Sequence, residues 1–269
     1  TGFLLLLALA GPQQVETTRN VVPSGIEIMI ALDVSGSMAA EDFQPLNRLE
    51  VAKDVLRDFI RARPSDRIGL ITFGGMSITR SPLTLQHEPL IRTVETIRMG
   101  DVPEGTAIGY AILNGVNRLS PKISAQKGAR ILVLITDGRN NAGEIHPLDA
   151  LPIAIQKKIK IYTIGVGSFG PVPFPVVKLP GKKQYIYEKA DLDEPLLRKI
   201  AEKSGGKYFR ASDPKSLQLL FQQINLLEKS EVRIVESRQL QNYSRVLAAP
   251  SAFLMFCYVL LTITIVRLP

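Results

Sequence analysis

No tryptophan occurs in the 269-residue chain, and its single cysteine, Cys257, lies in the apolar C-terminal part. One cysteine forms no disulfide within the chain, which excludes a small scaffold stabilised by disulfides. The only two histidines, His87 and His146, lie far apart in sequence and are each followed closely by proline. Neither a G-x-S-x-G motif nor a phosphate-binding G-x-x-x-x-G-K-[ST] loop occurs. The sequence therefore offers little support for nucleophilic or phosphoryl-transfer catalysis.

Disorder is excluded by composition, because hydrophobic residues make up 45% of the chain and suffice for a buried core. The net charge is +8, with the basic residues in small scattered clusters and no aromatic residues between them. A groove for single-stranded nucleic acid combines basic and aromatic residues, so we expect no nucleic-acid partner. We expect these basic residues to lie at solvated helix ends. Alternatively, they attract the domain to an anionic membrane surface.

Residues 26–32 are a run of mostly β-favouring apolar residues. Three polar residues, Asp33, Ser35 and Ser37, follow it directly. A strand this apolar is expected to be buried on both faces, as central strands of parallel sheets are. Ligands of open α/β sheets bind at the carboxyl ends of such strands. Hard oxygen ligands gathered there suit a hard cation such as Mg²⁺. The alternative is an ordinary turn, in which Asp and Ser bond to their own backbone.

Three segments together carry a family resemblance. Residues 33–37, D-V-S-G-S, resemble the D-x-S-x-S signature of von Willebrand factor A (vWA) domains, which hold a metal at a metal-ion-dependent adhesion site (MIDAS). Residues 104–109 resemble the metal-binding threonine loop of that family, and residues 131–138 resemble its fourth strand, which ends in a second aspartate. The resemblance implies that one divalent cation is bound by Asp33, Ser35, Ser37, Thr106 and Asp137.

The resemblance also implies roles for these residues. Ser35, Ser37 and Thr106 would be hydroxyl ligands, and Asp33 and Asp137 would bind directly or through water. Mg²⁺ is the first expectation for the cation, with Mn²⁺ and Ca²⁺ as alternatives. Two carboxylates balance the dication while the hydroxyls stay neutral, which leaves a position open for an Asp or Glu carboxylate of a partner protein.

The order of predicted elements indicates an α/β fold. Strands that alternate with helices predict βαβ units, so we expect a doubly wound, mostly parallel sheet with helices on both faces over residues 26–229. The vWA resemblance implies the same Rossmann-like architecture. Residues 168–187 contain four prolines and are expected to form an irregular or hairpin insertion. Residues 165–170 fit G-x-G-x-x-G, but prolines follow where a dinucleotide-binding helix must begin, so no nucleotide site is expected.

Both ends of the chain suggest a membrane. Residues 246–267 are almost wholly apolar and, as a helix, would span a bilayer core of about 30 Å. We expect a transmembrane helix there, since a buried core helix would show a polar face. Residues 1–12 are expected to be the end of an N-terminal transmembrane helix, with the apolar region of a signal peptide as the alternative. Residues 13–25 would then be a linker, and residues 230–245 a stalk or strand.

A narrower resemblance covers nearly the whole chain. Residues 136–150, 159–167 and 196–213, together with the apolar ends, resemble the BatA-type aerotolerance proteins of bacteria. That resemblance implies transmembrane helices flanking the vWA domain, which would face the periplasm from the bacterial inner membrane. It also implies a MoxR-type AAA+ ATPase and sister Bat proteins as partners.

The expected function is therefore a membrane-anchored module that binds a protein partner through its metal, and not an enzyme. Two alternatives remain: an inert membrane scaffold whose metal site is unused, and a metal-dependent hydrolase. The hydrolase needs a nearby general acid or base, and neither histidine lies in the three loops.

Overall fold

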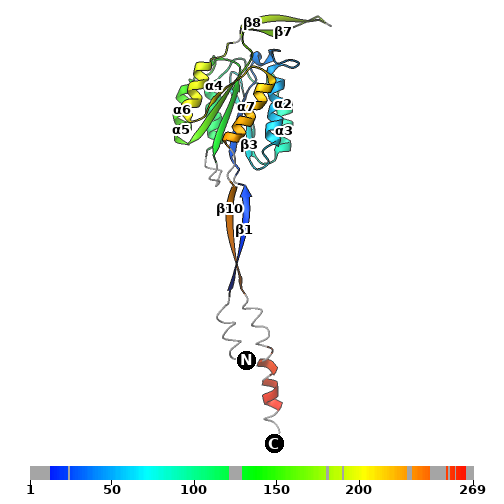
Figure 1. Cartoon of the computed structure of the whole chain (residues 1–269), viewed down its shortest axis with the longest axis vertical. Helices are drawn as coiled ribbons and strands as arrows, with labels where there is room; N and C mark the ends of the chain where they lie inside the picture. The colour runs from blue at the N-terminus through cyan, green and yellow to red at the C-terminus, as the bar shows by residue number, and fades with distance from the viewer. Residues whose placement is uncertain are drawn as a thin grey trace. The chain divides into compact units, whose positions relative to one another are not determined.

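The computed structural model describes residues 13–23, 25–120, 129–179, 182–189, 191–228 and 232–242, and near the C-terminal end residues 253, 255–257 and 259–264 (Figure 1). The chain divides into two compact units. One unit comprises Pro23–Glu231, and the other comprises Thr1–Val22 together with Val232–Pro269.

A six-stranded sheet forms the centre of the larger unit. Its strands are β2 (Glu27–Asp33), β3 (Arg67–Phe73), β4 (Ser77–Thr84), β5 (Arg130–Thr136), β6 (Ile159–Val166) and β9 (Tyr208–Ala211). They lie in the order β4-β3-β2-β5-β6-β9, with only β4 antiparallel to its neighbour. This order places β2 and β5 side by side at the centre, as expected of a doubly wound fold.

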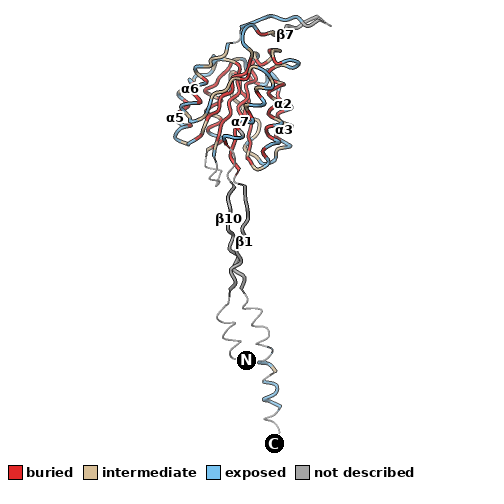
Figure 2. The backbone as a smooth tube through the Cα atoms, in the orientation of Figure 1, coloured by how far each residue is buried: buried red, intermediate tan, exposed pale blue. Residues whose placement is uncertain are grey.

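Helices cover both faces of the sheet. They are α2 (Arg48–Arg61), α3 (His87–Thr96), α4 (Ile108–Arg118), α5 (Pro147–Gln156), α6 (Glu194–Ser204) and α7 (Pro214–Leu227), with a short 3₁₀ helix, η1 (Gly36–Ala39). Alternate residues of β2 enter two separate apolar cores: Ile28 and Ile30 pack with α2, α3 and α7, and Met29 and Ala31 with α4, α5 and α6. Because both faces are covered, the four inner strands β3, β2, β5 and β6 are buried over nearly their whole length (Figure 2). The predicted fold class is confirmed.

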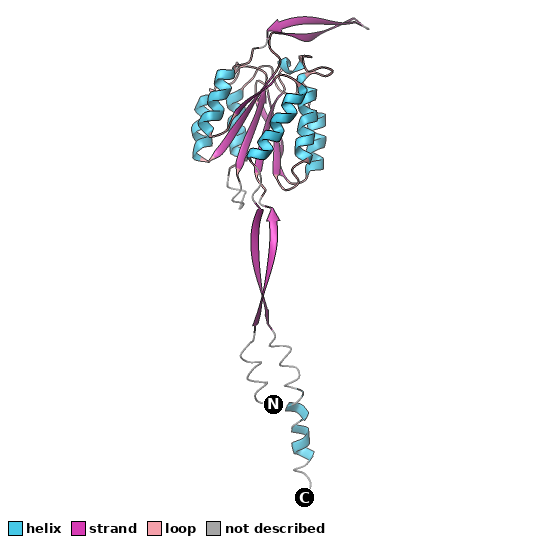
Figure 3. Ribbon diagram, viewed as in Figure 1, coloured by secondary structure: helices cyan, strands magenta, loops and turns pink. Residues whose placement is uncertain are grey.

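The proline-rich insertion forms a hairpin of β7 (Pro171–Leu179) and β8 (Lys182–Lys189), which pair antiparallel. Of the two predicted forms, irregular or hairpin, the hairpin is the one observed. The G-x-G-x-x-G segment that precedes it leads into β7 and not into a helix. Figure 3 shows the hairpin projecting beyond the ends of the sheet strands.

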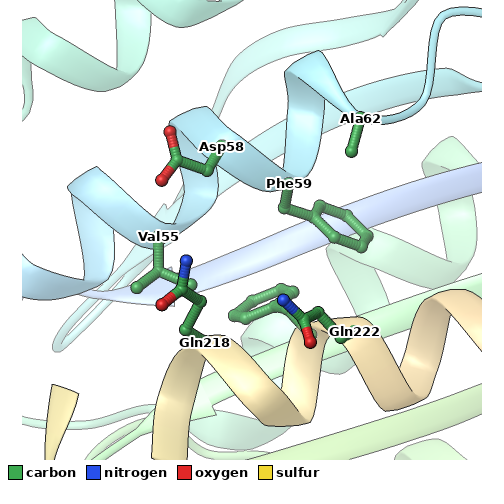
Figure 4. Close-up of a pocket in the computed structure, with 7 residues that line it drawn as sticks. Val55, Asp58, Phe59, Ala62, Gln218 and Gln222 are labelled. Carbon is green, nitrogen blue, oxygen red and sulfur yellow. The ribbon is translucent and has the colours of Figure 1, made fainter. Parts of the chain in front are cut away.

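The last helix of the domain, α7, packs against α2. Its N-terminus is fixed by a capping box, in which the side chain of Asp213 accepts from the backbone N–H of Ser216 and the Ser216 side chain accepts in return. The rings of Phe59 and Phe221 lie 4.8 Å apart between the two helices. Beside them is a small cavity of about 110 Å³ (Figure 4). It is lined by Val55, Asp58, Phe59, Ala62, Gln218, Phe221 and Gln222.

The smaller unit contains a two-stranded sheet of β1 (Gln13–Pro23) and β10 (Val232–Asn242). The sequence predicted a stalk or strand over residues 230–245, and β10 lies in that range. Residues 13–25 were predicted to be a linker, and a strand forms over most of this range. The physical reason is that β1 pairs its backbone with a segment from the other end of the chain, which local sequence does not reveal.

The predicted N-terminal membrane segment, residues 1–12, lies outside the described residues. Of the predicted C-terminal helix, residues 246–267, the described positions are helical. Within the described part of the chain, no helix combines the length and the apolar character needed to cross a bilayer.

The contact between α2 and α7 gives a test of the packing. Phe221→Ala is expected to lower the free energy of unfolding by about 3–5 kcal/mol, because it leaves a cavity against Phe59 in the core. Leu219→Ala is the matched control on the same helix, since the Leu219 side chain is 57% exposed and should change stability by less than about 1 kcal/mol. Denaturant unfolding of the whole chain measures both, and equal losses would contradict this packing.

Candidate metal centre

Two of the predicted site residues stand at the ends of neighbouring central strands. Asp33 is the last residue of β2, and Asp137 directly follows β5. The two strands are parallel, with Leu32 opposite Ile135, so their carboxyl ends coincide. The sheet alone therefore brings the two carboxylates, 104 positions apart in sequence, to one edge.

Hydrogen bonds connect the signature loop to both strand ends. Asp33 Oδ1 accepts from the backbone N–H of Ser35 at 2.9 Å, and Asp33 Oδ2 accepts from Thr136 Oγ1 at 2.5 Å. The hydroxyl oxygens of Ser35 and Ser37 lie 3.0 Å apart. Ser37 Oγ donates to Asp137 Oδ1 at 2.6 Å. Hydrogen bonds thus connect four of the five predicted residues.

The fifth predicted residue, Thr106, reaches the same place from the loop before α4. A Cβ atom at Gly138, next to Asp137, would lie 3.4 Å from Thr106 Oγ1, so the hydroxyl lies beside the end of β5. Asn141 fixes the Thr106 backbone, since its Oδ1 accepts from Thr106 N at 2.7 Å and its own N–H donates to Thr106 O at 3.1 Å. The structure therefore brings all five predicted residues together.

The Thr106 loop is also held from the other side by the turn between β3 and β4. Gly75 N donates to Pro103 O at 2.7 Å, and Ala107 N donates to Gly74 O at 2.7 Å. A Cβ atom at position 75 would lie 2.3 Å from the carbonyl oxygen of Glu104, closer than any side chain allows. The glycine is thus required for the close backbone approach that positions Thr106.

The electrostatics of the cluster favour a bound cation. Asp33 and Asp137 are both buried. Burial, and then the charge of Asp137, raise the pKa of the Asp33 carboxyl to about 7. Burial likewise raises the pKa of Asp137, against the opposing effect of a nearby arginine. Two buried carboxylates with three hydroxyls form a hard-oxygen donor set that fits Mg²⁺.

An alternative would be a metal site built from His, Cys, Asp and Glu side chains alone. Within the described residues, no group of three or more His, Cys, Asp and Glu side chains could hold a metal ion. The candidate centre differs from such groups because hydroxyls supply three of its five donors.

A third carboxylate lies at the rim. A Cβ atom at Gly36, between the two site serines, would be 3.4 Å from Glu104 Oε2. Glu104 is exposed and comes from the loop that carries Thr106. Negative charge therefore extends from the buried cluster to its opening.

Sequence reasoning missed Arg48, the first residue of α2. Its side chain is almost fully buried, and Arg48 Nη1 donates to Asp137 Oδ2 at 2.7 Å. Its Nε and Nη2 donate to the two oxygens of Asp42 at 2.8 and 2.7 Å. Burial tends to lower the pKa of Arg48, but the two carboxylates outweigh it and raise the pKa. Its spacing could have indicated that Arg48 is buried. It precedes the core residues Ala52 and Val55 by four and seven residues and so lies on the same helix face.

Asp42 extends the cluster toward the β7–β8 hairpin. Its Oδ2 accepts from the backbone N–H of Ser168 at 2.8 Å and from Ser168 Oγ at 2.9 Å. The neighbouring Glu41 donates its backbone N–H to Pro173 O at 2.9 Å, and its side chain accepts from Tyr185 OH at 2.8 Å. The base of the hairpin is therefore attached to the loop that follows the signature residues.

The fold and these residues define a class of protein. The family model described as von Willebrand factor type A domain matches residues 27–223. The chain belongs to that family.

Solved structures narrow the relationship. The chain is 30% identical to an aerotolerance-related membrane protein from Bacteroides fragilis, with 74% of this chain and 98% of that one covered and a TM-score of 0.61. It is also 30% identical to BatB from Bacteroides thetaiotaomicron, with 77% and 100% covered and a TM-score of 0.62. The predicted resemblance to Bat-type aerotolerance proteins is confirmed.

Further similar proteins carry names that describe no function, and one more distant solved structure shares the fold. The chain is 31% identical to an uncharacterized protein of Borreliella burgdorferi and 29% identical to a UPF0353 protein of Nocardia farcinica, covering 86% and 81% of this chain. It spans 67% and 66% of their lengths. Proximal thread matrix protein 1 of the mussel byssus, solved with a zinc-occupied MIDAS motif, is 16% identical with a TM-score of 0.57 and shares the fold.

The buried ion pairs of Arg48 give a test of the centre. Arg48→Met is expected to lower the free energy of unfolding by about 3–5 kcal/mol, because it leaves Asp42 and Asp137 without their cationic partner. Arg57→Met on the same helix removes a partly exposed pair with Asp54 and should cost less than about 1 kcal/mol. Urea unfolding compares the two, and a loss at Arg48 as small as that at Arg57 would show that the buried pairs do not support the fold.

Proposed function

We propose that the domain binds a divalent cation, Mg²⁺ in the first place and Mn²⁺ or Ca²⁺ as alternatives, and uses it to bind a partner protein. The ligands are the set predicted from sequence: Asp33, Ser35, Ser37, Thr106 and Asp137. The observation that carries the proposal is that two buried carboxylates meet three hydroxyl-bearing side chains at one edge of the sheet.

The charges of this donor set explain why a partner carboxylate would bind. Asp33 and Asp137 together balance the two positive charges of the cation, and the three hydroxyls add none. Magnesium prefers about six oxygen ligands and keeps waters where protein atoms are missing. An Asp or Glu of the partner replaces such a water, and its negative charge is drawn to a cation that neutral ligands have left electrophilic.

Protein binding is favoured over hydrolysis by the placement of the histidines. His146 is the N-cap of α5, where its Nδ1 accepts from Leu148 N, and His87 Nε2 lies 3.0 Å from Asp66 O. Both serve as local structural contacts outside the five-residue cluster. We propose accordingly that the protein is not an enzyme, since a hydrolase needs a positioned general base or acid. The inert scaffold is the remaining alternative.

We place this activity at a membrane. One relative is named as an aerotolerance-related membrane protein, and this name and the apolar residues 246–267 support a membrane anchor. We propose that the chain is anchored in the bacterial inner membrane with its vWA domain in the periplasm. The proposed partners are a protein that supplies the Asp or Glu carboxylate, sister Bat proteins and a MoxR-type AAA+ ATPase. Such a set suits maturation of protein complexes or a response to envelope stress.

Removal of one ligand tests the function. Asp33→Ala is expected to abolish Mg²⁺ binding in isothermal titration calorimetry, whereas Asp54→Ala, on the exposed side of α2, should bind as the wild type does. Proteins captured from membranes by wild type should be lost with chelator and with Asp33→Ala. Capture that depends on neither would favour the inert scaffold, and release of a small-molecule product would favour the hydrolase.

The pH dependence of cation binding follows from the pKa of Asp33, which is raised to about 7. A cation needs the ionised carboxylate, so below that pH it must displace a proton. The affinity for Mg²⁺ is therefore expected to rise about tenfold per unit between roughly pH 5 and 7 and to level off above. Calorimetry in buffers of different ionisation enthalpy measures the proton release. Equal affinity at about pH 5.5 and 7.5 would refute this linkage.

A further inference from the structure

The base of the β7–β8 hairpin is attached to the loop that follows the cation-binding serines. Its strand β7 accepts a hydrogen bond from the backbone N–H of Glu41, and its strand β8 donates one from the Tyr185 hydroxyl to the Glu41 side chain. Glu41 comes four residues after Ser37 in the chain. A partner that places a carboxylate on the cation therefore meets the base of this hairpin.

Large apolar and aromatic side chains of the hairpin and its base are exposed. The exposed fractions are 78% for Phe169, 67% for Tyr187, 52% for Ile186 and 39% for Tyr185. Tyr185 and Tyr187 are two residues apart on one strand and so share a face, the one that Tyr185 directs toward Glu41. Tyrosine is enriched in protein–protein interfaces because it offers a large contact area with few rotatable bonds. This face has the composition of an interface.

The base of the hairpin is held in a fixed arrangement. The Arg210 guanidinium lies over the Phe169 ring, 4.7 Å from its centroid, and donates to the carbonyl oxygens of Gly167 and Ser168. On the other side Ser168 is bound by Asp42, as described above. An ordered surface loses little conformational entropy when a partner binds.

Three prolines on β7 prevent a partner from adding a strand to one edge of this hairpin. Pro171, Pro173 and Pro175 alternate along β7, and their backbone positions share one side of the strand. Because Pro173 O accepts from the backbone N–H of Glu41, that side faces the Glu41 loop and not β8. Proline has no N–H, so the edge of β7 on that side cannot accept a further strand over these residues. Binding there must use side chains.

The charge of the hairpin identifies the kind of partner. Residues 169–189 contain four lysines and one glutamate, within a chain whose net charge is +8. Opposite charge across an interface speeds encounter and fixes orientation, so the complementary partner segment is acidic.

We propose that the β7–β8 hairpin and the cation site form one binding surface for an acidic partner segment that also carries apolar side chains. One carboxylate of the segment binds the cation, its apolar side chains contact Phe169 and Tyr187, and its other carboxylates complement the net positive charge of residues 169–189. This inference rests on the proposed function and extends it from a single ligand atom to a surface.

The test uses a fluorescein-labelled peptide of four Glu-Val repeats and measures its binding by anisotropy to the whole chain in nanodiscs, with Mg²⁺ or with chelator. Wild type is expected to bind this peptide only with Mg²⁺, and not to bind the matched Gln-Val peptide. The double variant Phe169→Ser/Tyr187→Ser should bind the Glu-Val peptide about tenfold or more weakly. Its Mg²⁺ affinity by calorimetry should equal that of wild type.

The control variant is Ile155→Ser, which removes a side chain that is 49% exposed at the C-terminal end of α5 and should leave peptide binding unchanged. Equal peptide affinity in wild type and the double variant would overturn the hairpin proposal. So would wild type that binds Mg²⁺ but not the peptide, and in both cases the cation site would stand. Failure of wild type to bind Mg²⁺ would instead refute the proposed function.

Discussion

The placement of two carboxylates, Asp33 and Asp137, side by side in a buried position is the constraint on which the site depends. Like charges away from water repel strongly, so each oxygen needs its own compensation. Thr136 and Ser37 donate hydrogen bonds to one oxygen of each carboxylate, and Arg48 pairs with the second oxygen of Asp137. These partners do not fully offset the cost of burying the charged groups, since burial keeps the pKa values of both carboxyls raised. A dication is the partner that matches both charges at once.

The ion pairs and hydrogen bonds that offset the charge of Asp137 also connect the site to the surface around it. Arg48 pairs with Asp42 as well as with Asp137, and Asp42 in turn accepts two hydrogen bonds from Ser168. A guanidinium presents its donors in a rigid planar fork, so it fixes two carboxylates relative to one another more firmly than an ammonium group does. The end of β5, the start of α2 and the base of the β7–β8 hairpin are therefore joined by one buried network. The chemistry of the cation site and the position of the hairpin are parts of one arrangement.

The parts of the fold and site that sequence predicts are those with local signals. An apolar run that ends in Asp33 marks both a central strand and its functional end, and the same holds for Asp137. Arg48 lacked such a signal, because its helix spacing indicates a core-facing side but not which distant carboxylates it meets. Strand β1 was assigned to a linker for a similar reason, since its partner β10 comes from the far end of the chain. Interactions between segments far apart in sequence are what single-sequence patterns do not contain.

The exposed Glu104 carboxylate opposes the approach of an acidic partner to the cation. Its carboxylate lies beside Gly36 at the opening of the site, where it repels an approaching acidic group. Coordination to the cation acts only at contact, whereas the net positive charge of residues 169–189 attracts from a distance of up to about a Debye length. The hairpin thus supplies the long-range attraction that Glu104 opposes, and the cation supplies the short-range bond. An acidic partner without access to the hairpin would meet the repulsion first, so selection among carboxylates lies with the surface and not with the metal alone.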